Sequence, residues 1–110
     1  MSTLIKPNYQ ECIEACQKCL VDCQVCITKM AGKDSMNDCP YCCVQCVESC
    51  LACIKMLASE SKWAPEYCRL CAEICDYCAE QCGAHDHDHC KACAESCRRC
   101  AEACRQVAAA

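Results

Sequence analysis

The stretch "CQKCLVDCQVC", residues 16–26, places cysteines at positions 16, 19, 23 and 26, at steps of three, four and three residues. Alternating steps of three and four mark the a and d positions of a heptad, the seam of a helix that packs in a bundle. A half-buried strand would alternate at every second residue instead. The stretch therefore predicts a helix that carries its cysteines along one face.

The same spacing recurs through the chain, which holds 21 cysteines in 110 residues. Twenty of them form four heptad stripes of five, and Cys42 lies beside the second stripe. The stripes are Cys12, Cys16, Cys19, Cys23 and Cys26; Cys39, Cys43, Cys46, Cys50 and Cys53; Cys68, Cys71, Cys75, Cys78 and Cys82; and Cys90, Cys93, Cys97, Cys100 and Cys104. Four stripes predict four helices.

Residues typical of helix ends separate the stripes. Gly32 is expected to end the first helix, and Pro40 and Pro65 to lie in the first turns of the second and third, where a missing N–H costs little. Asn8, with Glu11 three residues later, is expected to form a capping box before the first helix. These signals place the helix boundaries close to the ends of the cysteine stripes.

We expect helices at about 8–30, 39–59, 65–83 and 88–107. Because short links favour antiparallel neighbours, we predict one domain over 1–110, an all-α, antiparallel up-down-up-down four-helix bundle with a cysteine-lined core. This topology aligns the stripes in five layers of four thiols. The layers are Cys26/Cys39/Cys82/Cys90, Cys23/Cys43/Cys78/Cys93, Cys19/Cys46/Cys75/Cys97, Cys16/Cys50/Cys71/Cys100 and Cys12/Cys53/Cys68/Cys104.

Ordinary apolar residues are scarce, with five each of Leu, Ile and Val and no Phe. Cysteine must therefore supply much of the core, since a buried thiol packs as a small hydrophobe. Ile13, Leu20 and Ile27 on the first helix, and Val47 and Ile54 on the second, form a further apolar row. That row either seals the bundle between helices or joins protomers.

Composition also bears on location and partners. The formal net charge of −4 offers no basic patch for nucleic acid. The first residues, "MSTLIKPNYQEC", lack the pattern of a secretory signal, and no apolar stretch approaches the roughly 20 residues of a membrane span. We therefore expect a cytoplasmic protein with reduced thiols and no membrane partner.

Three explanations other than metal binding compete for the thiols. Disulfides within a helix are strained, because side chains one turn apart have Cβ atoms about 5–6 Å apart and a disulfide needs about 3.5–4.5 Å. Plain apolar filling needs no cysteine, since Ala, Leu or Ile would pack without the risk of oxidation. A thiol redox module, or any enzyme, is disfavoured because the C-x-x-C units lack a βαβ context and no catalytic motif is present.

Metal binding fits the spacing best. A metal–sulfur bond of about 2.3 Å puts two sulfurs on one ion at most about 4.6 Å apart, within reach of thiols one helical turn apart. Charge favours a monovalent ion, because each Cu(I) replaces one thiol proton, whereas zinc on four thiolates leaves two buried negative charges. We therefore expect many Cu(I) ions per chain, with all 21 cysteines, Cys42 included, as ligands; a broader Zn/Cd buffer is the alternative.

Soft ligands gather at one end of the expected bundle. The first and third links share this end and bring Met30, Met36, His85, His87 and His89 together. Neutral imidazole binds metal near pH 7, so we predict that ions enter here, with Cys42 one turn inside. Bulky residues are expected to close the other end: Tyr9, Met56, Leu57, Trp63, Tyr67 and Val107.

With cysteine heptads on four antiparallel helices, no signal sequence and a His-bearing link before the last helix, the sequence resembles the cytosolic bacterial copper storage proteins over about residues 8–107. The resemblance implies a bundle that holds many Cu(I) ions on its seam cysteines and fills through a His-bearing end. It implies His85, His87 and His89 as the residues of that end. It also implies a homotetramer and no enzymatic activity.

Overall fold

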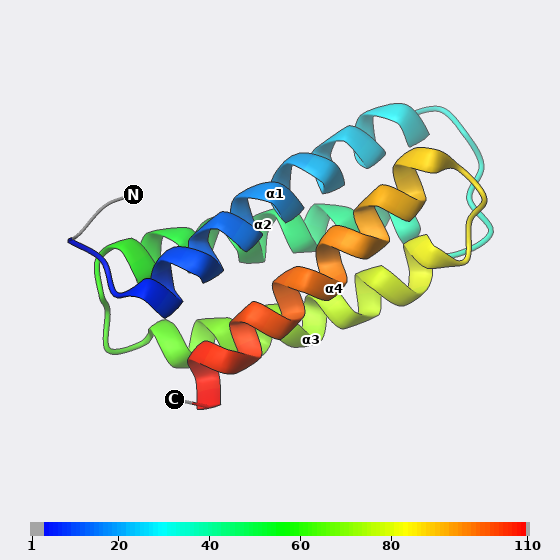
Figure 1. Cartoon of the computed structure of the whole chain (residues 1–110). Helices are drawn as coiled ribbons and strands as arrows, with labels where there is room; N and C mark the ends of the chain where they lie inside the picture. The colour runs from blue at the N-terminus through cyan, green and yellow to red at the C-terminus, as the bar shows by residue number, and fades with distance from the viewer. Residues whose placement is uncertain (1–3, 110) are drawn as a thin grey trace.

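The structure, a computed structural model, describes residues 4–109, so residues 1–3 and 110 of the predicted domain lie outside it. Four helices follow one another in the described part of the chain: α1 Pro7–Met30, α2 Cys39–Ala58, α3 Ala64–Gly83 and α4 Asp88–Ala109. They run alternately in opposite directions, and α4 returns beside α1 (Figure 1). The predicted all-α antiparallel four-helix bundle is confirmed.

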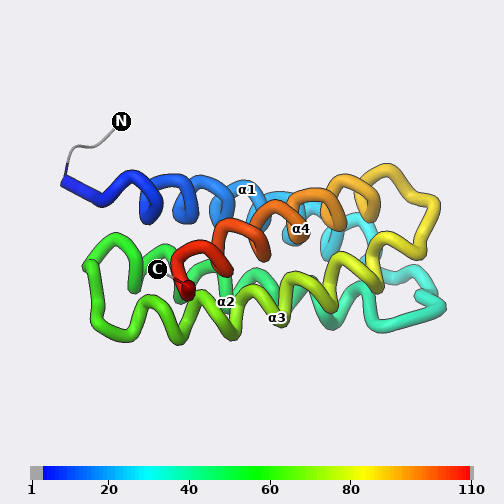
Figure 2. The backbone as a smooth tube through the Cα atoms, turned by 60° about the horizontal axis from the view of Figure 1, so that its bottom comes forward, coloured from blue at the N-terminus to red at the C-terminus, as the bar shows by residue number. Residues whose placement is uncertain are grey.

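The two ends of the bundle differ in what they contain. The α1–α2 link, residues 31–38, and the α3–α4 link, residues 84–87, lie together at what we call the histidine end (Figure 2). The α2–α3 link, residues 59–63, lies at the opposite end, as do the start of α1 and the end of α4. Soft ligands from different parts of the sequence are thereby brought to one end.

Proline and glycine set several helix ends. Pro7 opens α1, with Lys6 at the N-cap position and no side-chain cap. The predicted capping box at Asn8 is wrong, because Pro7 has the backbone φ of a helix and starts it one residue earlier. Gly32 ends α1 as predicted, with a φ of +78° that costs glycine nothing. The expected prolines also open α2 and α3.

Cysteine forms most of the core. All 21 cysteines are buried, none more than 1% exposed. Ile13 is buried, and Leu20, Ile27, Val47 and Ile54 pack against the core, which supports their role as a seal within the bundle. Alanines are also buried along α3 and α4, where their small side chains allow close packing of the two helices.

Two aliphatic side chains fill the opposite end. Leu57 is fully buried and Val107 is 1% exposed, while Tyr9 and Met56 pack against the core. The prediction that Tyr67 and Trp63 close this end is wrong, since Tyr67 is 39% exposed and Trp63 is 56% exposed. Trp63 lies at the N-cap position of α3, and the Lys62 ammonium sits 5.0 Å from its ring centroid, a cation–π contact formed in solvent.

One helix of the described residues, α2, is long and apolar enough to cross a membrane by length and composition alone. The expectation that no stretch has that character is wrong for this helix. Its six cysteines count as apolar residues, and all of them face the interior of the bundle. Such a composition is also that of a core helix, so it is weak evidence for a membrane span.

Candidate metal centre

The sulfur atoms of the core meet in the predicted layers. Each layer contains at least one contact between Sγ atoms of different helices. These include Cys12–Cys104 at 3.6 Å, Cys16–Cys100 at 3.6 Å, Cys19–Cys46 at 3.5 Å, Cys23–Cys93 at 3.3 Å and Cys26–Cys90 at 3.6 Å. Contacts of α2 with α3 fall in the same layers: Cys39–Cys82 at 3.0 Å, Cys43–Cys78 at 3.8 Å and Cys46–Cys75 at 3.4 Å. The predicted register of the four stripes is therefore confirmed.

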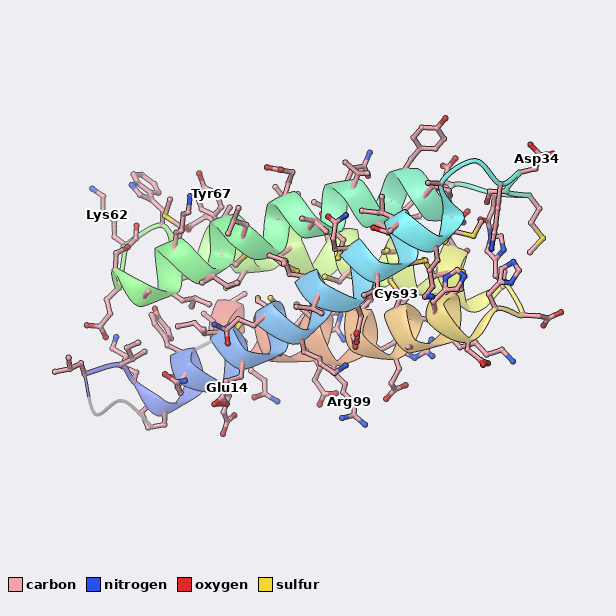
Figure 3. The ribbon with its side chains drawn as sticks, turned by 90° about the horizontal axis from the view of Figure 1, so that it is seen from above. Glu14, Asp34, Lys62, Tyr67, Cys93 and Arg99 are labelled. Carbon is pink, nitrogen blue, oxygen red and sulfur yellow. The ribbon has the colours of Figure 1, made fainter. Side chains whose placement is uncertain are left out.

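Contacts between layers join the sulfurs into one column along the bundle axis. Cys19 and Cys23, one turn apart on α1, have their Sγ atoms 3.9 Å apart. Cys43 and Cys82 connect adjacent layers across α2 and α3 at 3.5 Å. In Figure 3 many of the yellow sulfur atoms lie between the ribbons, as in the region of the labelled Cys93.

Many of these thiols form groups of four whose sulfur atoms all lie within 4.8 Å of one another. The groups include Cys16/Cys71/Cys100/Cys104, Cys19/Cys46/Cys50/Cys75, Cys19/Cys23/Cys46/Cys97, Cys23/Cys43/Cys78/Cys93 and Cys26/Cys43/Cys82/Cys93. Two sulfurs on one ion sit at most about 4.6 Å apart, so small side-chain rotations suffice for binding. Four of the five groups share members, and the contact of Cys71 with Cys75 at 3.8 Å joins the remaining group to them, so the core offers a continuous series of sites.

Among the described residues, no buried lysine or arginine is present to balance thiolate charge in the core. The buried polar side chains of the described residues are those of His85 and Ser96, and no lysine or arginine is among them. Burial raises the pKa of the Cys39 thiol to about 11 and also raises the pKa of Cys90. Without metal these thiols are protonated and neutral at pH 7, so binding must displace their protons.

Cys42 lies beside the column. It is 1% exposed, and its thiol donates to the Cys39 carbonyl oxygen at 3.2 Å. Ser49, one heptad further along α2, donates to the Sγ of Cys71 on α3 at 3.4 Å. Positions 42 and 49 thus form a row beside the seam. Because Ser49 lies one heptad after Cys42, the sequence could have indicated that Ser49 lies beside the thiols.

The histidines form a stack at the histidine end. The ring centroids of His85 and His87 lie 6.0 Å apart, and those of His87 and His89 5.2 Å apart. His85 is buried at 7% exposure, and His89 Nδ1 lies 3.5 Å from the Sγ of Cys90. The stack therefore extends from the α3–α4 link to the first cysteine of α4.

The two methionines predicted to take part in metal uptake differ in burial. Met30 is 3% exposed and belongs to the core, whereas Met36 is 70% exposed and lies outside it. Asn37, one residue further on, lies 2.9 Å by its Oδ1 from His85 Nε2. The sequence marks Asn37 only as a polar turn residue, and no local pattern indicates its contact with a histidine 48 positions away.

Twenty-one buried free thiols, many of them in groups that each fit one ion, define a thiolate-lined helical bundle able to hold several soft metal ions at once. The family model described as copper storage protein matches residues 5–109. The chain belongs to the copper storage protein family. That family is one of storage proteins and not of enzymes.

Relatives with solved structures share the fold over most of the chain. The Cu(I)-bound copper storage protein BsCsp3 is 39% identical, with a TM-score of 0.87, over 92% of this chain and 98% of its own. The apo form of copper storage protein 3 from Bacillus subtilis is 41% identical, with a TM-score of 0.85, over 90% and 97%. The cysteine-rich protein YhjQ of Bacillus subtilis (strain 168) is 41% identical over 93% and 98%.

Proposed function

We propose that this protein stores and sequesters many Cu(I) ions in the cytoplasm, with the thiolates of its 21 cysteines as the ligands. The observation that carries the proposal is the column of fully buried sulfur atoms, without a buried lysine or arginine in the described residues. A solved relative that binds Cu(I) shares this fold at 39% identity. Buried ligands sequester ions well because water and competing thiols do not reach them.

Charge favours Cu(I) over zinc, while distance does not discriminate between them. Sulfurs within 4.8 Å of one another suit a digonal or trigonal Cu(I) site and a tetrahedral zinc site alike. One Cu(I) per displaced proton leaves the core neutral at any loading. Zinc on four thiolates adds two negative charges per site, and desolvating each costs several kcal/mol.

The histidine end is the proposed route by which ions enter. His85, His87 and His89 form a stack that ends beside Cys90, so a bound ion has neutral ligands along the way to the first thiol layer. Met30 adds a buried thioether at this end, and the exposed Met36 an accessible one. Cys42 is proposed to join the thiol ligands one turn further in.

Titration of the fully reduced protein tests the proposal. Cu(I) is added anaerobically against a competing chromogenic chelator, zinc is added separately, and protons released are counted in weak buffer. Storage predicts saturation near one copper per thiol with about one proton released per copper. Tight binding of only four or five zinc ions, with weaker copper binding, would instead establish the Zn/Cd buffer.

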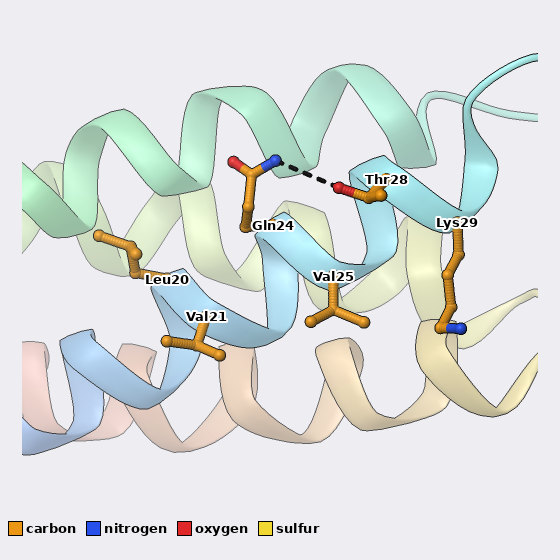
Figure 4. A pocket seen from close by; sticks show the side chains of 6 residues that line it. All are labelled: Leu20, Val21, Gln24, Val25, Thr28 and Lys29. Atoms are coloured by element: carbon orange, nitrogen blue, oxygen red, sulfur yellow. Dashed lines mark hydrogen bonds between the residues drawn. The ribbon is translucent and has the colours of Figure 1, made fainter.

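We further propose that the chain assembles with copies of itself, as the homotetramer that the family resemblance implies. Val21 and Val25 are 54% and 41% exposed on α1, and they line a shallow groove with Leu20 (Figure 4). Light scattering after size exclusion measures the assembly. Val21→Glu should dissociate it, and a wild-type monomer at micromolar concentration would contradict the proposal.

A further inference from the structure

The side chain of Asn37 joins three separate parts of the histidine end. Its Oδ1 accepts a hydrogen bond from the backbone N–H of Cys39 at 3.0 Å, in the first turn of α2. Its Nδ2 donates to the backbone carbonyl of Gln81, near the end of α3, at 2.8 Å. The same Oδ1 lies 2.9 Å from Nε2 of His85, in the α3–α4 link.

Two of these partners fix the orientation of the amide. A backbone N–H only donates and a backbone carbonyl only accepts, so the atom near Cys39 is the amide oxygen and the atom near Gln81 is the nitrogen. His85 therefore faces an oxygen that can only accept. Its Nε2 must carry the proton, and Ser35 Oγ, 3.2 Å from the same nitrogen, offers a further acceptor.

A proton on Nε2 leaves the lone pair of neutral His85 on Nδ1, the nitrogen with which the ring can bind a metal ion. Hydrogen bonds of this kind set the tautomer and the ring orientation of metal-binding histidines. The Asn37 oxygen also holds the backbone of Cys39, whose Sγ lies 3.9 Å from that of Cys90 in the layer nearest this end.

We infer that Asn37 is a positioning residue for copper uptake: it holds His85 as the Nε2–H tautomer and sets that ring relative to the first thiol layer. This inference rests on the proposed storage function and goes further, because it assigns a role to a residue that does not itself bind copper. Without Asn37, the His85 ring exchanges between tautomers and orientations, and only part of the population presents Nδ1.

The tautomer is measured directly on the copper-free protein by long-range 1H–15N correlation spectra at pH 8. Wild type is expected to show a pyrrole-type Nε2 and a pyridine-type Nδ1 for His85. Asn37→Ala should give averaged shifts for both nitrogens. Asn37→Asp keeps an acceptor oxygen facing His85 and Cys39, so it should restore the Nε2–H tautomer, although it loses the hydrogen bond to the Gln81 carbonyl and is expected to be less stable than wild type. Tyr77→Phe, which leaves all three Asn37 contacts in place, is the folded comparison.

Loading kinetics test whether the positioning matters for uptake. Cu(I) is delivered from a chelator in stopped flow to wild type, Asn37→Ala, His85→Ala and the double variant. Asn37→Ala should slow loading roughly tenfold, as loss of such an outer hydrogen bond often does, and should add nothing in the His85→Ala background. Tyr77→Phe, which removes a hydrogen bond to Asp38 in the same link, is the matched control and should load as wild type.

The outcomes separate the inference from the storage function. An unchanged His85 tautomer in Asn37→Ala, or equal slowing in both backgrounds, overturns the positioning role. If wild type itself takes up few copper ions, the storage function fails, and the tautomer of the copper-free protein still decides whether Asn37 positions His85.

Discussion

The Sγ atoms of Cys39 and Cys82 lie 3.0 Å apart across the α2–α3 interface, closer than the 3.3 Å between Cys23 and Cys93. Both residues belong to the layer nearest the histidine end, where small molecules have the shortest path into the core. A disulfide requires an S–S distance of about 2.05 Å, which a modest rotation of the two side chains would reach. Thiol pairs deeper in the column lie further from this end of the bundle.

We expect a mild two-electron oxidant such as diamide to join Cys39 and Cys82 first in the copper-free protein, with both thiol protons and two electrons passing to the diamide. This disulfide would remove two thiol ligands at the histidine end and slow copper uptake. Alkylation followed by peptide mass spectrometry identifies the first pair lost. Cys82→Ala is the control and should leave Cys39 open to alkylation; a different first pair in wild type contradicts the prediction.

Removing a central thiol pair should lower capacity without unfolding the bundle. Cys46 and Cys75 have their Sγ atoms 3.4 Å apart in the middle layer, and both are fully buried. The double alanine variant should bind about two fewer Cu(I) ions, since each ion replaces one thiol proton. Each substitution should destabilise the fold by about 1 kcal/mol.

A variant can also bind less copper because its fold is less stable, so the double alanine variant needs a control for stability. Ser96, buried on α4, donates a hydrogen bond to Asp22 on α1, and neither side chain is a thiol ligand. Ser96→Ala should lower the free energy of unfolding by about 1 kcal/mol and leave the copper stoichiometry unchanged. If Ser96→Ala also binds fewer copper ions, copper capacity depends on the stability of the fold. The lower capacity of the double alanine variant would then not be due to its two missing ligands.

The fold and the thiol layers could be predicted from the sequence because both depend on the heptad repeat of the cysteines. Heptad spacing fixes which face of every helix is buried, and short links fix antiparallel neighbours, so the spacing alone suffices to pair Cys23 with Cys93. A cap depends instead on a single residue. Pro7 moved the start of α1 by one position and removed the expected role of Asn8.

The residues that organise the histidine end could be predicted only in part. The spacing of His85, His87 and His89 marks them as a group, but their stacking depends on how one link folds. The contact of Asn37 with His85 joins two links whose side-chain orientations follow from backbone conformation and not from a repeat. Likewise, nothing in the pattern distinguishes the buried Met30 from the exposed Met36.

Copper uptake should depend on His87 and His89, the two less buried histidines of the stack. His87 is exposed, and His89 lies beside Cys90, so replacing both with alanine removes ligands without removing a buried side chain. Loading from a Cu(I) chelator should slow several-fold while final capacity stays the same. Lys62→Ala, at the opposite end, is the matched control; uptake at the wild-type rate in the histidine variant would place the route elsewhere.

The stability of the copper-free protein should fall at high pH. Burial raises the pKa of Cys39 from 9.0 to about 11, so between these values the folded chain binds more protons than the unfolded chain. Under that condition the free energy of unfolding decreases as pH rises. The contribution is fully present below pH 9 and is lost as the pH passes about 11.

Thermal unfolding followed by circular dichroism, in anaerobic reducing buffer between pH 8 and pH 11, measures this loss. The copper-free protein should show a falling Tm over that range. The Cu(I)-loaded protein is the control, because its thiolates have no proton left to release, and its Tm should stay nearly constant and higher. A parallel fall in both forms would show that groups outside the thiol core govern the alkaline transition.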